Sequence, residues 1–148
     1  LYIVCREIGT PRTLKEISEI SNVKRKDLAR SYRLIVSKLE LKIPVLDPIK
    51  CIGRVANKVN LSEITKRKAI DLMYKVNEHE LAAGKDPMGF AASVLYLCMN
   101  KDRAQSDKIK SENRTQSDLA AAAGVTEVTI RNRIQELRKK NLKIIQVF

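Results

Sequence analysis

The chain has 148 residues, of which 44% are hydrophobic and only 4% aromatic, and its formal net charge is +12 at pH 7. This composition excludes general disorder and predicts a core of Leu, Ile, Val and Ala in one mid-sized domain or two small ones. Few Gly and Pro residues and little β-branched alternation favour an all-α fold, and the basic charge favours a polyanionic partner, most often nucleic acid, over a merely soluble basic surface.

The first predicted elements form a short helix, a turn and a longer helix. Residues 1–8 resemble the end of an apolar helix, and because the chain starts at Leu1 without Met we expect further residues before it. Thr13 and Glu16 form a capping box that opens a helix carrying Leu14, Ile17 and Ile20. Asn22 makes the turn, and a second helix runs from about residue 24 to 40. Its predicted apolar face consists of Val23, Leu28, Tyr32, Ile35 and Leu39.

Two further helices follow a connector at residues 41–47. Asp47 and Pro48 are an N-cap and a first-turn proline, and they open a helix that ends at Asn60. Ser62 caps a longer helix that reaches about Leu81. Its predicted inward residues are Ile64, Ala69, Met73 and Val76. The run Lys66-Arg67-Lys68 on this helix fits a solvated face better than a phosphate or partner contact.

The last three helices repeat the layout of the first three. Asp86 and Pro87 open a helix to about Asn100 that is apolar nearly all round and predicts the buried centre of its domain. A polar loop at residues 101–113 is expected to be mobile. Thr115 then caps a short helix, Gly124 makes a turn, and Thr126 caps the last long helix. The apolar tail at 142–148 is expected to pack back on the domain or to mark a truncated end.

An internal repeat organises these elements. Arg12 and Thr13 correspond to Arg114 and Thr115 at an offset of 102 residues, and the stretch LYIVC at the start of the chain matches LYLCM at 95–99. A repeat fixes the architecture before any other assignment. The second copy contains five predicted helices and the first only the last three. We therefore predict residues 1–43 as the C-terminal part of one repeat and residues 44–148 as a complete second repeat.

The last helix of the second copy has an outward face suited to DNA bases. Its inward stripe is Ile130, Ile134 and Leu137, and helical spacing places another set on the opposite side. The predicted base-reading residues are Val128, Thr129, Arg131, Asn132 and Gln135. In a major groove Arg can bind guanine, Asn and Gln can read adenine, and Val can touch a thymine methyl. A helix-turn-helix that serves only helical packing is the alternative.

Other residues predict phosphate contacts. Arg12 and Arg114 each precede an N-cap threonine, and the N-terminus of a helix favours an anion. The predicted phosphate contacts are Arg12, Thr13, Arg114, Thr115, Thr126 and Arg133. In the first copy the outward positions are mostly basic, which suits backbone phosphates or an acidic partner surface better than base edges. These predicted DNA or partner contacts are Lys24, Arg25, Lys26 and Arg30.

The sequence argues against several other kinds of site. Cys5, Cys51 and Cys98 are far apart and lie among apolar neighbours, which predicts buried reduced thiols. With His79 as the one histidine and no cysteine cluster, we predict no metal site and no cofactor in this fragment. The absence of a Gly-rich phosphate loop or of a nucleophile–base signature predicts that the chain is not an enzyme, has no catalytic residue and takes no small-molecule substrate.

The motifs PRTLKEISEISNV, GKDPMGFAASVLY and RTQSDLAAAAGVTEVTIRNRIQEL together resemble the core domain of archaeal transcription factor B, the counterpart of eukaryotic general transcription factor IIB. The resemblance covers essentially the whole chain. It implies tandem cyclin-like five-helix repeats, each ending in a helix-turn-helix, with the first repeat truncated here. It further implies that Val128 and Arg131 are the main base readers, and that a zinc ribbon belongs only to the N-terminal region outside this sequence.

The expected function is therefore that of a general transcription initiation factor core. The resemblance implies binding to promoter double-stranded DNA together with the TATA-binding protein, reading of an upstream promoter element, and help in recruiting and orienting RNA polymerase. We expect a monomer in the archaeal cytoplasm, associated with the nucleoid, without membrane contact. A cyclin-like protein–protein adaptor that never reads bases is the main alternative, and a stand-alone helix-turn-helix regulator is a third.

Overall fold

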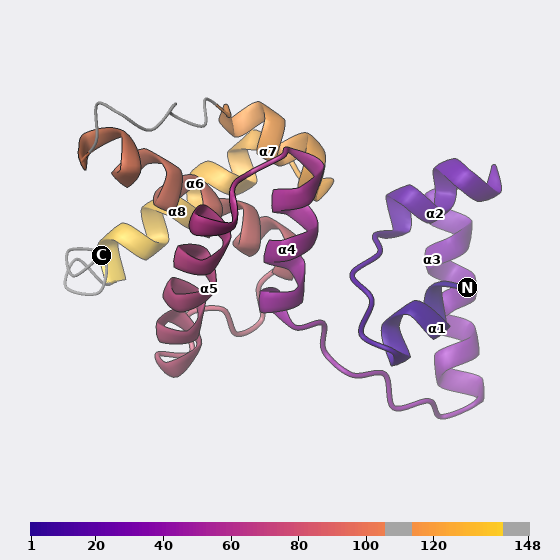
Figure 1. Cartoon of the computed structure of the whole chain (residues 1–148). Helices are drawn as coiled ribbons and strands as arrows, with labels where there is room; N and C mark the ends of the chain where they lie inside the picture. Colours follow the sequence, from indigo (N-terminus) through magenta and orange to yellow (C-terminus); the bar gives the residue numbers. More distant parts are fainter. Residues whose placement is uncertain (106–113, 141–148) are drawn as a thin grey trace.

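The computed structural model describes residues 1–105 and 114–140, with side chains from 1 to 99 and from 114 to 139. These residues form eight α-helices and no strand, so the all-α prediction is confirmed (Figure 1). No helix in this part of the chain is long and apolar enough to cross a membrane. The predicted tail at 142–148 lies outside the described residues.

The helices fall into two groups on either side of a linker (Figure 1). We call the first group the N-terminal unit, which consists of α1 (Tyr2–Glu7), α2 (Leu14–Ser21) and α3 (Arg25–Lys38). The second group is the C-terminal unit, which consists of α4 (Pro48–Lys58), α5 (Glu63–Glu78), α6 (Pro87–Gln105), α7 (Gln116–Ala123) and α8 (Glu127–Lys140).

The helix boundaries follow the capping chemistry of the sequence. Both threonine capping boxes are formed, with Thr13 and Glu16 around α2 and Thr115 and Asp118 around α7. Asp47 caps α4 by accepting a hydrogen bond from the amide of Ile49 at 2.9 Å. Each cap satisfies amides that would otherwise lack an intrahelical partner. The predicted starts of these helices are therefore confirmed.

The internal repeat is confirmed at the level of the backbone. Helix α2 and helix α7 begin and end at positions 102 residues apart, and the same offset relates α3 to α8. Both short helices end at a residue in the left-handed conformation, Asn22 with φ 55° and Gly124 with φ 70°. Two helix-turn-helix motifs of the same length and turn geometry therefore stand in one chain.

Helix α6 is the centre of the C-terminal unit. It packs against α4, α5, α7 and α8, and its side chains from Met88 to Met99 are buried apart from Tyr96. Phe90, Val94 and Leu95 are almost fully enclosed. The prediction that this nearly all-apolar helix is the buried centre is confirmed, because a helix without a polar face needs neighbours on every side.

Two predicted details of this unit are wrong. Ile64 was expected to point inward, but it is 56% exposed, and Thr65 is buried in its place. The buried positions of α5 are Thr65, Ala69, Leu72, Met73 and Val76, and Ile64 is five residues before Ala69, which places it well off that stripe. Helix α6 also continues to Gln105, so the first part of the predicted loop at 101–113 is helical. The rest of that loop lies outside the described residues.

The predicted apolar faces of the N-terminal unit are largely exposed. Ile35 on α3 and Leu39 directly after α3 are 40% and 65% exposed, and Ile20 on α2 is 75% exposed. Helix α3 packs on α2 and meets α1 through an edge-to-face contact between Tyr2 and Tyr32, whose ring centroids are 5.0 Å apart. Among the described helices none covers the other side of α3, so helical spacing alone did not decide burial there.

The prediction of buried, reduced thiols is confirmed. Cys5, Cys51 and Cys98 are all buried, and none of them forms a disulfide. Burial raises the pKa of the Cys51 thiol to about 12, and the carboxylates of Asp86 and Asp47 add to this effect. A thiol held in its neutral form is a packing group and not a nucleophile or a metal ligand.

Candidate nucleic-acid interface

The outward face of α8 combines one exposed apolar residue with polar groups. Thr126 caps the helix by accepting a hydrogen bond from the amide of Thr129 at 3.2 Å. Ile130, Ile134 and Leu137 are buried against the unit, as predicted. Val128 is 57% exposed, and the neighbouring outward positions are also exposed, namely Arg131, Asn132 and Gln135. The structure thus places four of the five predicted base-reading residues on one solvent-facing surface.

Thr129, the fifth residue of that set, is held in place by the protein itself. It is half-buried, and its hydroxyl shares a hydrogen bond of 2.9 Å with the hydroxyl of Thr126. Its methyl carbon lies only 3.2 Å from the point where a β-carbon on Gly89 would stand. Thr129 therefore connects the outward face of α8 to the start of α6, at a contact that any side chain at position 89 would crowd.

Arg133, a predicted phosphate contact, points away from this surface. Its Nη1 donates to Oε2 of Glu136 at 2.6 Å, and Lys85 donates to the same oxygen at 3.2 Å. The hydrogen bond from Arg133 and, after it, the one from Lys85 hold the pKa of the Glu136 carboxyl below its usual range. The charge of Arg133 is thus directed at the junction between α8 and the turn before α6.

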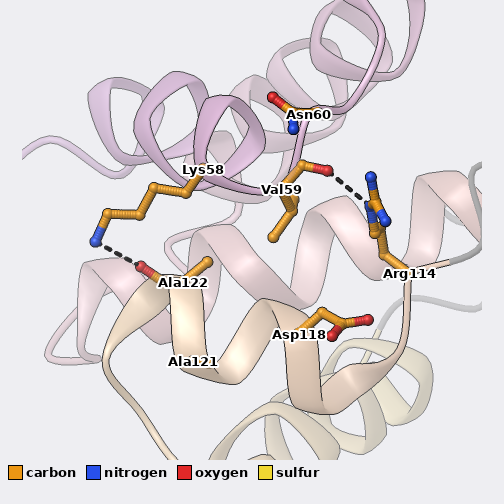
Figure 2. A pocket seen from close by; sticks show the side chains of 7 residues that line it. All are labelled: Lys58, Val59, Asn60, Arg114, Asp118, Ala121 and Ala122. Atoms are coloured by element: carbon orange, nitrogen blue, oxygen red, sulfur yellow. Dashed lines mark hydrogen bonds between the residues drawn. The ribbon is translucent and has the colours of Figure 1, made fainter.

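Arg114 and Thr115, also predicted phosphate contacts, take part in packing α7 on α4. Arg114 Nε donates to the carbonyl oxygen of Val59 at 2.7 Å, and Thr115 caps α7. A shallow hollow of about 470 Å³ lies between these helices. Figure 2 shows its lining residues, with Arg114 at one end and Lys58 at the other. Lys58 Nζ donates to the carbonyl oxygen of Ala122 at 3.2 Å. Two polar bonds to backbone carbonyls thus tie the helix-turn-helix to α4.

A second hollow, of about 450 Å³, lies where the N-terminal unit meets the C-terminal unit. The predicted phosphate contacts Arg12, Thr13 and Thr126 all line it, together with Arg25. The helices α2 and α8 both begin at this hollow, because Thr13 and Thr126 precede them. Helix N-termini and guanidinium groups both favour anions, so this arrangement can hold negative charge.

The basic residues at the start of α3 form an exposed group. Lys24, Arg25, Lys26 and Arg30 are all exposed. Lys24 occupies the N-cap position without a capping hydrogen bond from its side chain. The equivalent position in the second copy is Thr126, which does cap its helix. The two helix-turn-helix motifs therefore share a backbone but differ in the charge and shape that they present.

Sequence reasoning identified only one of the contacts of Glu16 and did not single out Arg54 and Lys58 as its partners. Glu16 was identified as the second half of a capping box, but its Oε1 also accepts hydrogen bonds from Arg54 and Lys58 on α4, each at 2.5 Å. Arg54 and Lys58 are four residues apart and so share one face of their helix. The spacing of residues in the sequence does not link that face of α4 to a carboxylate about forty residues earlier. No local sequence signal could therefore have predicted this contact.

No group of three or more His, Cys, Asp or Glu side chains capable of holding a metal ion occurs among the residues that the structure describes. The polar side chains described above instead donate to one another or to backbone carbonyls, or are exposed. What the arrangement can do chemically is bind anions and hydrogen-bond the edges of flat polar groups.

The chain matches the model of the transcription factor TFIIB repeat over residues 1–38 and 41–140. It is 41% identical over 140 residues to "Transcription initiation factor IIB" of Pyrodictium occultum, covering 95% of this chain and 43% of that protein. It is 42% identical over 144 residues to the protein of the same name from Sulfurisphaera tokodaii, covering 97% of this chain and 44% of that protein. For Methanoculleus marisnigri the identity is 41% over 140 residues, with coverage of 95% and 39%.

The chain thus spans about two fifths of the length of the relatives that it matches. These relatives are named as transcription initiation factors and not after a catalytic activity. The match of the family model over both units, the paired helix-turn-helix motifs and the all-helical fold agree with one another. The chain belongs to the transcription factor TFIIB repeat family.

Proposed function

We propose that this chain is the DNA-binding core of a transcription initiation factor. In this proposal it binds promoter double-stranded DNA together with the TATA-binding protein, and α8 reads an upstream promoter element. It thereby helps to recruit and orient RNA polymerase. Residues 1–43 act as the C-terminal part of one cyclin-like repeat and residues 44–148 as a complete second repeat. We propose a monomer that works at the archaeal nucleoid.

The outward face of α8 is the observation that carries this proposal. Val128 stands 57% exposed beside the polar side chains of Arg131 and Asn132. An exposed branched apolar residue next to a guanidinium and an amide matches what the major groove offers, namely a thymine methyl and the hydrogen-bonding edges of guanine and adenine. Helix α8 is the second helix of a helix-turn-helix, which is the element that enters the groove in proteins of this kind.

The hollow between the units supports a backbone contact next to that helix. Arg12 and Arg25 come from the N-terminal unit and Thr126 from the cap of α8, and all three line the same hollow. A phosphate placed there would lie among the guanidinium groups of Arg6, Arg12 and Arg25 and near the N-termini of α2 and α8, although the carboxylate of Asp86 also lines the hollow. Phosphate contacts of this type fix the register of a protein on the duplex, while the neighbouring α8 supplies the sequence preference.

The unequal faces of the two motifs would give the protein a direction on DNA. Val128 and Arg131 in the second motif correspond to Lys26 and Ala29 in the first. Lys26 is exposed and suits phosphates or an acidic partner, whereas Ala29 can make no hydrogen bond to a base. One end of the molecule would then read sequence and the other would not, which is what an initiation factor needs to set the direction of transcription.

A gel-shift experiment on promoter DNA tests the proposal. The chain is titrated onto DNA that contains a TATA box, with and without the TATA-binding protein, and onto DNA with a scrambled upstream element. We expect tight binding only when the TATA-binding protein is present and the upstream element is intact. Equal binding in every lane contradicts the proposal, and tight dimeric binding without the TATA-binding protein would instead identify a stand-alone regulator.

Arg131→Ala is the variant that isolates base reading. We expect it to cost about 1–3 kcal/mol at the upstream element and to flatten the base preference there, because one guanidinium–base pair is lost. Arg67→Ala serves as the control, because it removes one equal positive charge from an exposed position on α5 instead of α8. Both variants should lose the same small amount on scrambled DNA, since that binding is electrostatic. An equal loss for both variants on both DNAs argues against base reading.

A protein–protein adaptor is the second candidate function, and one observation favours it. The N-terminal unit exposes a series of large apolar side chains that suit a protein partner better than DNA, namely Ile20, Leu34, Ile35 and Leu39. An adaptor that never reads bases would bind DNA weakly or not at all, and Arg131→Ala would leave that affinity unchanged. The gel-shift comparison described above therefore separates the two functions.

A further inference from the structure

The capping-box glutamate of the first helix-turn-helix also contacts the other unit. Glu16 Oε2 accepts the amide hydrogen of Thr13 at 3.0 Å, which closes the cap of α2. Its other oxygen, Oε1, accepts hydrogen bonds from Arg54 and Lys58, each at 2.5 Å. Both of these cations belong to α4 in the C-terminal unit. The two oxygens of one carboxylate thus have separate tasks, one within α2 and one between the units.

Lys58 also contacts the second helix-turn-helix. Besides Glu16, its ammonium group donates to the carbonyl oxygen of Ala122 near the C-terminal end of α7, as Figure 2 shows. A β-carbon on Gly124, in the turn of the same motif, would stand 3.7 Å from the methyl carbon of Thr13. The start of α2 is therefore seated on α4 and on the turn between α7 and α8.

The ion pairs described between the two units both end on Glu16. The side chains of Glu16 and Arg54 are 18% and 14% exposed, so solvent and salt screen this pair less than a surface pair. Arg54 and Lys58 lie four residues apart on α4, where two like charges repel. Without the carboxylate between them, these two cations would repel each other and Arg54 would keep a poorly solvated charge.

We infer that Glu16 is a positioning residue that holds the two helix-turn-helix motifs in one fixed orientation, through its ion pairs with Arg54 and Lys58. Its effect on DNA rests on the proposed function, but its effect on the orientation of the units does not. A fixed orientation lets both motifs contact one DNA molecule at the same time. Units that move independently would lose part of that benefit, because binding by the second motif then depends on its effective concentration near the DNA.

Glu16→Gln separates the two tasks of the carboxylate. Glutamine also serves as the third residue of a capping box, so the cap of α2 is retained while the charge that faces Arg54 and Lys58 is removed. Glu19→Gln is the matched control. It makes the same change on the same helix, but Glu19 is an exposed residue whose described ion pair is with Lys15 in α2 itself. Equal helical content by circular dichroism shows that both variants are folded.

The orientation is measured without DNA by pulsed electron–electron double resonance. Spin labels are attached at Ser37→Cys on α3 and Ser117→Cys on α7, which are exposed positions in the two units, whereas the native cysteines are buried. We expect one narrow distance distribution for the parent chain and for Glu19→Gln, and a clearly broader or shifted one for Glu16→Gln. An unchanged distribution in folded Glu16→Gln overturns the inference.

The same variants are then tested on promoter DNA with the TATA-binding protein. We expect Glu16→Gln to lose about tenfold in affinity, while Glu19→Gln binds like the parent chain. A parent chain that shows no promoter preference contradicts the proposed function, yet the distance measurement still tests the role of Glu16. A broadened distribution together with unchanged promoter affinity overturns the step from orientation to DNA binding.

Discussion

At the scale of single residues, Gly89 lies where the start of α6 contacts the start of α8. Gly89 faces Thr129 and Val125, and a β-carbon there would stand 3.2 Å and 3.5 Å from their methyl carbons. Its amide donates to Oδ2 of Asp86 at 2.7 Å, which caps α6. The N-terminal turns of α6 and α8 therefore meet at a position without a side chain, which lets Thr129 approach α6 closely.

We expect Gly89→Ala and Gly53→Ala to differ in stability. Both glycines lie inside helices, where alanine gains roughly 0.5–1 kcal/mol over glycine. A β-carbon on Gly53 meets nothing within 4 Å, so Gly53→Ala should stabilise the chain by about that amount. At position 89 a β-carbon would stand 3.1 Å from Oδ2 of Asp86 and 3.2 Å from the methyl carbon of Thr129. This crowding offsets the gain, and we expect no stabilisation or a net loss. Urea denaturation measures the free energy of unfolding of both variants. Equal stabilisation would show that the atoms around Gly89 can shift to accept a β-carbon without a loss of stability.

At the scale of the elements, the turns of the two helix-turn-helix motifs use different residues for the same backbone conformation. The left-handed conformation is least costly for glycine and next for asparagine, whose side chain can hydrogen-bond locally. Gly124 and Asn22 are the two residues concerned. Because α2 and α7, and α3 and α8, match in length, the two turn residues occupy equivalent positions of the repeat.

We expect Gly124→Ala to destabilise the C-terminal unit by about 1–2 kcal/mol, since an alanine must adopt a positive φ there. Gly124→Asn should cost less, because asparagine already occupies the equivalent position at residue 22 with φ 55°. Thermal unfolding of the two variants beside the parent chain gives the comparison. Equal costs for the two substitutions would contradict the backbone conformation as the cause, because a β-carbon at position 124 would meet Thr13 only at an ordinary contact distance of 3.7 Å.

At the scale of the whole molecule, the contacts of Glu16 predict how stability depends on pH. Burial raises the pKa of Glu16, but hydrogen bonds from Lys58, from the amide of Thr13 and from Arg54 outweigh burial and lower the pKa to about 2. The folded chain therefore binds fewer protons than the unfolded chain between that value and the ordinary value of 4.5. The stabilising effect of Glu16 is fully present above the ordinary value and is lost as the pH falls towards 2.

Comparison of the parent chain with Glu16→Gln isolates this effect. We expect the difference in free energy of unfolding between the two to be on the order of 1–3 kcal/mol at about pH 5 and to shrink towards pH 2, after discounting for partial solvent screening. Chemical denaturation across this pH range is the measurement. Other carboxyls with a lowered pKa, such as Asp118 and Glu136, contribute equally to both chains and cancel. A pH-independent difference would contradict the assigned ion pairs.

The sequence by itself determined most of the local structure. Threonine caps, turn residues and a 102-residue repeat specified where α2, α7 and α8 begin and where the turns after α2 and α7 lie, since these features act over a few residues and need no distant partner. It also determined which residues face outward on α8, because Ile130, Ile134 and Leu137 left the opposite side to Val128 and Arg131. The charge of +12 and the helical composition bounded the class of partner and the fold.

Only the tertiary structure decided which charges are engaged. Arg133 and Arg114 were predicted to contact phosphates, yet one is bonded to Glu136 and the other to the carbonyl of Val59. Glu16, predicted only as a cap, joins the two units through Arg54 and Lys58. The physical reason is distance along the chain. Caps and helical stripes arise from neighbours, whereas ion pairs between α2 and α4 depend on how whole helices come together, which no local pattern records.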